Sequence, residues 1–268
     1  IVKEVLVREG DEVKEGQMLM ALDPAVARAN YESVRQRYLG LRAMQGRLLA
    51  EQAGAATIAF HPDLQAAASD PLIRQQMQNQ EQLFMTRRNL LRSDLQSIEE
   101  SIQGQEGLLQ AYRGMLDNRA NQLRLVNEEL ANLRGLVREG YAPRNRQLEM
   151  ERMVSDISTS MADLQGNSVR ASRTIAELRQ RALSRQQEYR KEVETQLADV
   201  GREVLAENEK LYAVTNDLDR TEIKAPAEGQ VVGLVTQTVG GVVAPGQKLM
   251  DIVPKGEPLL LEARVAPH

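Results

Sequence analysis

The chain has 268 residues, of which 27% are charged and 3% aromatic, and its net charge is −4 at pH 7. So few aromatic residues do not suit a thick globular core, and a weakly negative chain without a basic stripe excludes nucleic acid as the expected partner. Cysteine is absent, which is compatible with the cytoplasm or the periplasm, and no apolar run approaches the ~18 residues of a membrane-spanning helix.

The two ends of the chain are similar in sequence and form an internal repeat. At an offset of 230 positions, nine of the first 24 residues recur without a gap. The identical pairs are Val2/Val232, Val5/Val235, Gly10/Gly240, Val13/Val243, Gly16/Gly246, Gln17/Gln247, Leu19/Leu249, Met20/Met250 and Pro24/Pro254. Each copy is too small to bury a core alone, so we expect the two copies to meet in space.

Both copies have the pattern of short strands separated by glycine turns. Residues 1–7 and 231–239 are rich in β-branched residues, and the repeated glycines supply turns at strand ends. The pattern predicts a small flattened barrel made of two halves, residues 1–23 and 220–258. A further strand-like run opens the last segment, 259–268.

The region between the two copies, 24–219, has a helical pattern. Asp23 and Pro24 form an N-cap and N1 pair, which predicts a first helix over about 24–53 with a length of ~45 Å. The alanine-rich residues 54–70 are expected to be extended and to span up to ~56–61 Å, enough to bring the chain back to the barrel. The sequence therefore predicts a three-helix segment near the barrel and a two-stranded far end.

A second helix, 71–138, carries a long apolar seam. From residue 91 the seam positions are spaced alternately by four and three, and only two of them are polar. They are Leu91, Leu95, Ile98, Ile102, Gln105, Leu109, Tyr112, Leu116, Arg119, Leu123, Val126, Leu130, Leu133 and Val137. A 3.5-residue repeat sustained over this length predicts a coiled coil.

A third helix, 143–218, carries a matching seam. Its positions are Met150, Val154, Ile157, Met161, Leu164, Ser168, Ala171, Ile175, Leu178, Ala182, Arg185 and Tyr189. The chain reverses at 139–143, where Gly140 ends one helix and Pro143 opens the next. Both helices would run for about 100 Å, so together they predict an antiparallel hairpin with its tip at 139–143.

No catalytic constellation stands out. The two histidines, His61 and His268, lie in the linker and at the last position, and no metal-ligand or phosphate-binding motif is present. Carboxylate pairs such as Glu99 and Glu100 are expected to be solvated helix surface. The sequence predicts a protein that is not an enzyme and has no metal or cofactor.

The repeated ends resemble the lipoyl and biotinyl carrier domains. The first half of that fold is similar to EGDEVKEGQML at 9–19, and the second half to IKAP at 223–226, GQV at 229–231 and PGQKL at 245–249. The carrier pattern places the modified lysine at Val26, which cannot be acylated. An enzyme carrier subunit is therefore the less favoured interpretation.

A split lipoyl-like domain around a helical hairpin resembles the periplasmic adaptors, or membrane fusion proteins. The tip sequence LVREGYAPRNR at 136–146 resembles the HlyD type, in the protease and lipase group of type I secretion. LEARV at 261–265 resembles the entry to that family's next barrel, which implies that 259–268 is the start of a truncated β-barrel domain. The implied fold class is α+β and elongated: a long antiparallel coiled-coil hairpin of three helices inserted between two halves of a lipoyl-like β-barrel-sandwich domain.

The resemblance also implies a role and partners. It implies the periplasmic portion of a bacterial protein anchored in the inner membrane, linking an ABC transporter to a TolC-like outer-membrane channel as a structural conduit, with six copies in a ring. The alternative is an adaptor of a drug-efflux pump. The short first helix and its linker favour secretion, and a cytoskeletal rod would leave the repeated ends unexplained.

The hairpin tip is the candidate partner-binding site. The predicted contact residues are Arg134, Leu136, Arg138, Gly140, Tyr141, Pro143, Arg144 and Asn145. Tyr141 and Leu136 would supply apolar contacts, and the arginines would pair with carboxylates or cap helix ends of the channel. The family pattern of Arg, Leu and Ser is met only at Leu136, because Asn132 and Pro143 hold the other two positions and Arg134 lies nearby.

Overall fold

The structure is a computed structural model, and it describes residues 1–235, 238–244 and 246–254. The chain divides into two compact units, described separately below. The first contains 1–50, 56–80 and the chain from 197 onward, and the second contains 51–55 and 81–196. The predicted further β domain at 259–268 and the predicted end of the second half-barrel at 255–258 lie outside the described residues.

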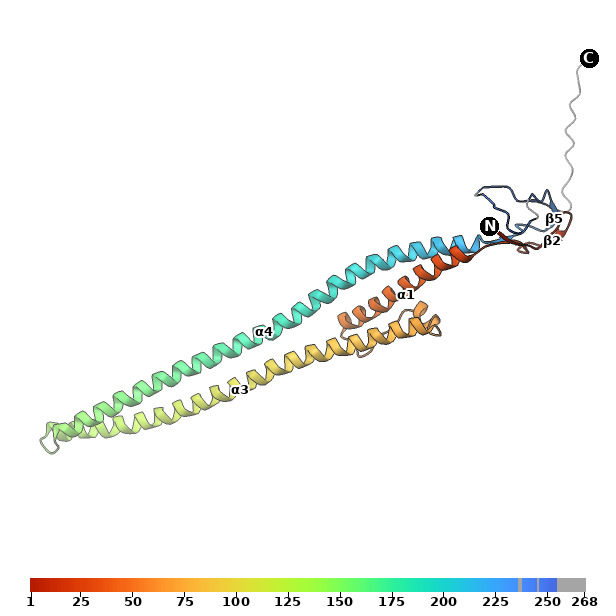
Figure 1. The fold of residues 1–268 in the computed structure, drawn as a ribbon. Coiled ribbons are helices and arrows are strands. Elements are labelled where there is room, and N and C mark those ends of the chain that lie inside the picture. The colour runs from red at the N-terminus through yellow and green to blue at the C-terminus, as the bar shows by residue number, and fades with distance from the viewer. Residues whose placement is uncertain (236–237, 245, 255–268) are drawn as a thin grey trace, which may run out of the picture. The chain divides into compact units, whose positions relative to one another are not determined.

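In the first unit, short strands from both ends of the chain form two antiparallel three-stranded sheets (Figure 1). One sheet has the order β1 (Val2–Val5), β3 (Met18–Leu22) and β4 (Glu222–Lys224). The other has the order β2 (Glu12–Val13), β5 (Gly229–Val232) and β6 (Asp251–Val253). Each sheet thus pairs a strand of the first repeat with a strand of the second.

The core between these sheets also draws on both repeats. Its buried residues are Val7, Val13, Leu19, Ala225 and Val231, and the half-buried Met250 and Ile252 pack against them. Because apolar burial is the main favourable term in folding, neither half keeps a core without the other.

The turn around the repeated Gly-Gln pair explains part of the internal repeat. In the first copy the Gln17 side chain accepts a hydrogen bond from the Lys14 amide at 3.0 Å, and in the second Gln247 accepts from Ala244 at 3.0 Å. The preceding glycines have φ values of 76° and 79°, a region that favours glycine. The identities therefore reflect one turn that is built twice.

The helices are α1 (Ala25–Ala53), α2 (Pro62–Ala66), α3 (Pro71–Arg138) and α4 (Arg144–Asp219). Val26, the position of the carrier lysine, lies in the first turn of α1 and is 75% exposed. In the first unit, side chains of α1 contact both long helices. Arg37 forms an ion pair with Glu207 of α4 at 3.4 Å, and Arg47 donates a hydrogen bond to Gln80 of α3 at 2.8 Å.

The linker 54–70 differs from the prediction. It is not extended, because it contains the short helix α2, whose Leu64 is fully buried. Tyr38 of α1 donates to Asp63 at 2.6 Å, and Arg35 pairs with Asp70 at 3.4 Å. The chain therefore returns only to the level of Arg35 on α1, about ten residues or ~15 Å after the helix begins, and not to the barrel.

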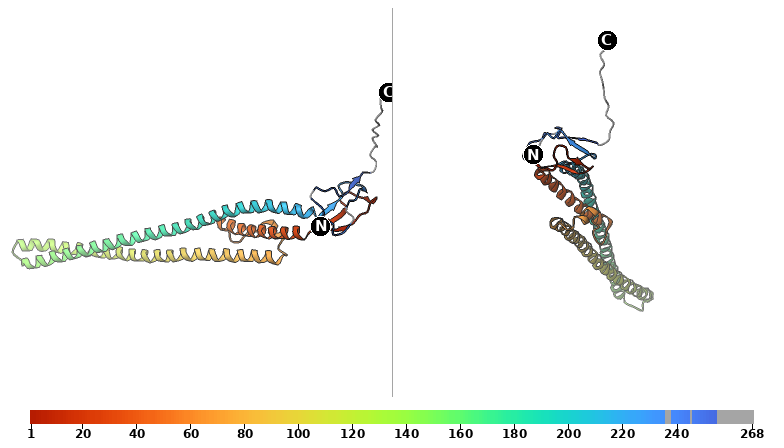
Figure 2. Two further views of the ribbon diagram at one scale, coloured as in Figure 1. Left: turned by 45° about the horizontal axis from the view of Figure 1, so that its top comes forward. Right: turned by 90° about the vertical axis from the view of Figure 1, so that its right-hand side faces the viewer.

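In the second unit α3 and α4 lie side by side and antiparallel (Figure 2). Every predicted seam residue is buried or half-buried except Arg119, which is exposed. Near the turn, Val126, Leu130, Met150 and Ile157 form a buried cluster. The predicted α+β class, with a long helical hairpin between two β halves, is confirmed.

Candidate functional site: the hairpin tip

The turn at the tip is a Schellman motif. The amide of Tyr141 donates to the Leu136 carbonyl at 2.9 Å, and that of Gly140 donates to the Val137 carbonyl at 3.2 Å. Gly140 has a φ of 81°, the left-handed conformation that this motif requires at the residue after the helix end. The last carbonyls of α3 are thus satisfied within the turn, which fixes the path of the chain.

This turn exposes two large apolar side chains. Tyr141 is 81% exposed and Leu136 is 47% exposed. Leu148, in the first turns of α4, is 43% exposed and was not among the predicted contact residues. These apolar side chains project from a turn whose backbone is fixed by hydrogen bonds, so little backbone order has to be gained when a partner binds.

The predicted arginines differ in their surroundings. Arg134 is engaged within the hairpin: its guanidinium donates to Glu151 of α4 at 2.8 and 3.3 Å. This contact, with a further bond from Gln147, holds the pKa of Glu151 below its ordinary value. In contrast, Arg138 and Arg144 are exposed and form no ion pair with another described residue. They are the cations available to a partner.

The first turn of α4 has an unusual charge pattern for a helix start. It contains Arg144 and Arg146 and no acidic residue, although the positive end of the helix dipole favours acidic side chains there. Arg146 is partly compensated by Glu149 at 3.3 Å. The predicted residues Asn145 and Pro143 are exposed beside it. The local electrostatics favour an acidic or helix-C-terminal group on a partner.

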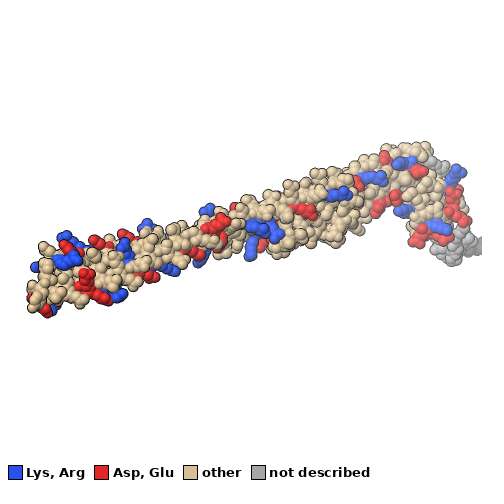
Figure 3. All heavy atoms as spheres, turned by 90° about the horizontal axis from the view of Figure 1, so that it is seen from below, with Lys and Arg blue, Asp and Glu red and all other residues tan. Residues whose placement is uncertain are grey.

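On the face seen in Figure 3, basic and acidic side chains alternate along the helices without a large area of one sign. Among the described residues, no group of His, Asp and Glu is arranged to hold a metal ion. Within the same part of the chain, no helix is apolar enough over a sufficient length to cross a bilayer.

The chain matches a known protein family over most of its length. The family described as "AprE, long alpha-helical hairpin" matches residues 27–217. Among curated relatives, the alkaline protease secretion protein AprE of Pseudomonas aeruginosa is 36% identical over 99% of this chain and 62% of its own. The proteases secretion protein PrtE of Dickeya chrysanthemi is 35% identical over 99% of this chain and 59% of its own.

A third relative, the type I secretion system membrane fusion protein PrsE of Rhizobium meliloti, is 30% identical over this whole chain and 61% of its own. The chain thus spans about three-fifths of the length of these curated relatives.

Two solved structures resemble the chain. The soluble domain of LipC, a membrane fusion protein of a type I secretion system, superposes with a TM-score of 0.89 at 35% identity, over 95% of this chain and 96% of that one. The periplasmic adaptor protein EmrA matches with a TM-score of 0.60 at 18% identity, over 94% of this chain and 68% of that one, and shows the fold alone. The chain belongs to the AprE family of long α-helical hairpins, whose relatives include secretion proteins and membrane fusion proteins of type I secretion systems.

Proposed function

We propose that this chain is the hairpin and split-barrel portion of a periplasmic adaptor for type I protein secretion. The full protein would link an inner-membrane ABC transporter to a TolC-like outer-membrane channel and act as a structural conduit without catalysis. The observation that carries the proposal is the match to LipC, which covers nearly all of both chains at 35% identity. The curated names of AprE, PrtE and PrsE support the same role.

The tip residues would dock on the channel. Tyr141 and Leu136 offer apolar area, and Arg138 and Arg144 lie beside them without an ion-pair partner in the described chain. Apolar side chains surrounded by arginines are typical of the few residues that dominate binding energy at interfaces. Arg134 would contribute differently from the other arginines, by holding the two helices together through Glu151.

Self-association into a ring, with six copies, belongs to the same proposal. A conduit needs a closed wall, and a single antiparallel helix pair encloses no channel. Cyclic symmetry is the usual way in which identical subunits close such a wall. The inner-membrane anchor would lie in the part of the full protein beyond this chain.

The test is secretion in a strain that lacks the gene and carries the full-length protein in trans. We expect Leu136→Asp and Tyr141→Asp to abolish export, because a desolvated carboxylate at a docking surface costs several kcal/mol. Both side chains are exposed, so helicity and thermal unfolding should stay unchanged. Secreted substrate and circular dichroism are measured for each variant.

The matched control is Tyr212→Asp, which makes the same change at a tyrosine of α4 that is 70% exposed and far from the tip in sequence. Its export should remain close to that of the original protein. Normal secretion by both tip variants would contradict docking through the tip. Failure of the unaltered gene to support export of any type I substrate, with restored drug resistance instead, would favour the efflux alternative.

A further inference from the structure

Each of the two long helices, α3 and α4, has two flanks beside its seam, and the two flanks differ in charge. We define the leading flank of a helix as the residues that come immediately before its seam residues, and the trailing flank as those that come immediately after. One residue turns a helix by ~100°, so the flanks lie on opposite sides of the seam. In an antiparallel pair, the leading flanks of both helices face one side of the hairpin and the trailing flanks face the other.

The leading flank of α3 is uncharged over a long stretch. Its members are Ser101, Gly104, Leu108, Ala111, Met115, Asn118, Gln122 and Leu125, and all are exposed. Leu108, Met115 and Leu125 are 47, 52 and 56% exposed. The charged residues of this stretch lie elsewhere: Glu106, Arg113, Asp117 and Arg124 on the trailing flank, and Arg119 in the seam.

In α4 the arrangement is reversed, and the trailing flank is uncharged from Ser155 to Ala176. Its members there are Ser155, Ser158, Ala162, Gln165, Val169, Ser172 and Ala176, and all are exposed. The next trailing-flank residue, Arg179, is charged and pairs with Glu106 of α3 at 2.8 Å. Asp156, Asp163 and Arg170 lie on the leading flank. One side of the hairpin therefore carries the uncharged flank of α3, and the other side carries the uncharged flank of α4. Head-to-tail association requires two different surfaces on opposite sides of this kind.

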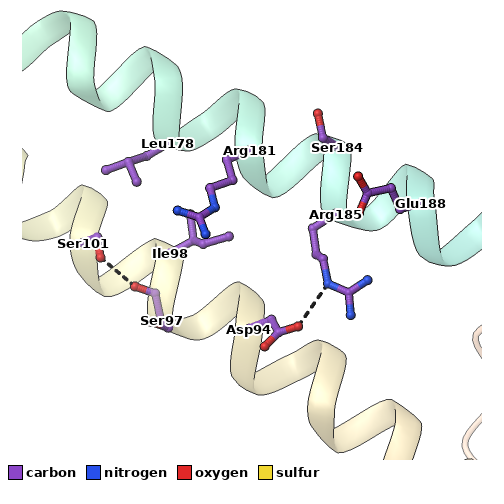
Figure 4. Close-up of a pocket in the computed structure, with 9 residues that line it drawn as sticks. All are labelled: Asp94, Ser97, Ile98, Ser101, Leu178, Arg181, Ser184, Arg185 and Glu188. Atoms are coloured by element: carbon purple, nitrogen blue, oxygen red, sulfur yellow. Dashed lines mark hydrogen bonds and ion pairs between the residues drawn. The ribbon is translucent and has the colours of Figure 1, made fainter.

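The side of the leading flanks also carries a hollow of about 470 Å³ between the helices (Figure 4). The half-buried seam residues Ile98 and Leu178 lie in it. Around them are small leading-flank residues, Ser97 and Ser101 from α3 and Ser184 from α4. Charged residues complete the lining: Asp94 from α3, and Arg181, Arg185 and Glu188 from α4. The hollow adjoins the uncharged face of α3, which starts at Ser101. It offers apolar contacts at Ile98 and Leu178, bordered by serine and charged side chains.

An exposed leucine lies at nearly the same height on the opposite side. Leu183 belongs to the trailing flank of α4 and is 47% exposed. Two ion pairs set the axial alignment of the helices, Arg185 with Asp94 at 3.0 Å and Arg179 with Glu106 at 2.8 Å, and together they place Leu183 about level with residues 96–102 of α3. Copies related by a cyclic axis stay at one height, so the leucine of one copy reaches the hollow of the next.

We propose that Leu183 of one copy enters the hollow at Ser97, Ser101 and Leu178 of its neighbour. The uncharged trailing flank of α4 then packs along the uncharged leading flank of the neighbour's α3. This inference rests on the proposed self-association and assigns its surface. Burial of the leucine and of the apolar residues along the flanks drives the contact, and the small residues allow the two helices to approach closely.

The test uses cysteine pairs in the full-length protein, because the chain has no cysteine of its own. Ser97→Cys with Leu183→Cys should give, on oxidation in cells, a ladder of dimers, trimers and larger species. Ser101→Cys with Leu183→Cys is a second pair with the same expectation. Each single-cysteine variant should give no species beyond the monomer.

The matched control is Gln103→Cys with Leu183→Cys. Gln103 is exposed and follows a seam residue, so it lies at a similar height on the wrong side of the hairpin. A ladder from this control equal to that of the Ser97 pair would overturn the proposal. Bridging of the Ser97 and Ser101 pairs within single monomers would also overturn it.

Secretion is measured in the same cells, which separates the two proposals. Export by the double-cysteine variants without any ladder would overturn the assigned surface and leave the adaptor function standing. Loss of the adaptor function itself would appear as absent export with the unaltered gene, whatever the crosslinks show.

Discussion

Glu9 connects the two halves of the barrel through its carboxylate. One oxygen accepts a hydrogen bond from the Gly233 amide at 2.7 Å and the other accepts from the Leu234 amide at 2.8 Å. These bonds favour the ionised form and lower the pKa of Glu9. A folded pKa below the unfolded one means that the contact stabilises the fold above the ordinary pKa, and that this stability is lost as the pH falls through the lowered value.

We therefore expect Glu9→Gln to remove part of the acid sensitivity of the barrel. The difference in urea midpoint between the variant and the original protein should be largest at neutral pH and should shrink as the pH falls into the acidic range. Glu15→Gln is the control, since the described residues offer Glu15 no hydrogen-bond partner. An effect of Glu9→Gln that does not change with pH would contradict this explanation.

Gly140 has a conformational role that Gly135, five residues earlier, does not have. Gly140→Ala should destabilise the tip by about 1–2 kcal/mol, because its φ of 81° is strained for a residue with a Cβ. Gly135→Ala should instead stabilise the hairpin by ~0.5–1 kcal/mol, since Gly135 is helical and a Cβ there would meet no atom within 4 Å. Urea unfolding followed by circular dichroism measures both, and equal effects would contradict the assignment.

At the scale of the helices, the buried seam residues near the tip stabilise the hairpin. Leu130 is 4% exposed within its cluster, so Leu130→Ala should cost about 2–5 kcal/mol. Leu125 is 56% exposed on the same helix, and Leu125→Ala should change stability by less than ~0.5 kcal/mol. Chemical denaturation of the isolated chain compares the two, and similar losses would mean that the seam is misplaced.

The helical hairpin could be predicted from sequence because its pattern is local and long. Apolar residues spaced by four and three specify one face of a helix regardless of what lies elsewhere in the chain. The exception is Arg119, whose long side chain can leave the seam and reach water. A single polar residue in a long seam does not alter the fold.

The structure of the linker could not be predicted in the same way. Helix α2 has five residues, too few for a periodic pattern, and it is held by contacts with distant residues such as Tyr38 and the core around Leu64. The tip shows the same limit. Its turn follows from Gly140, but the engagement of Arg134 with Glu151 depends on the axial alignment of two helices.

At the scale of the whole molecule, both sheets depend on strands from the two ends of the chain. Removing residues 221–268 should leave α3 and α4 helical, because their seam is complete without the barrel. Residues 1–23 should then become sensitive to proteases, since they lose β4, β5 and half of their core. Limited proteolysis with mass spectrometry measures this, and a protected first half would contradict a shared core.

The split between the halves also imposes an order on folding. While the protein is being synthesised, β1 to β3 leave the ribosome long before β4 and β5 are made. During this time β2 and β3 lack the strands with which they pair in the second half. The two long helices can pair without the barrel. Their pairing brings the end of α4 close to the start of α1, so that β3 and β4 are no longer separated by a very long flexible loop. A substitution that delays the pairing of α3 with α4 should therefore delay closure of the barrel as well, and leave the unpaired edges of β1 to β3 open to aggregation.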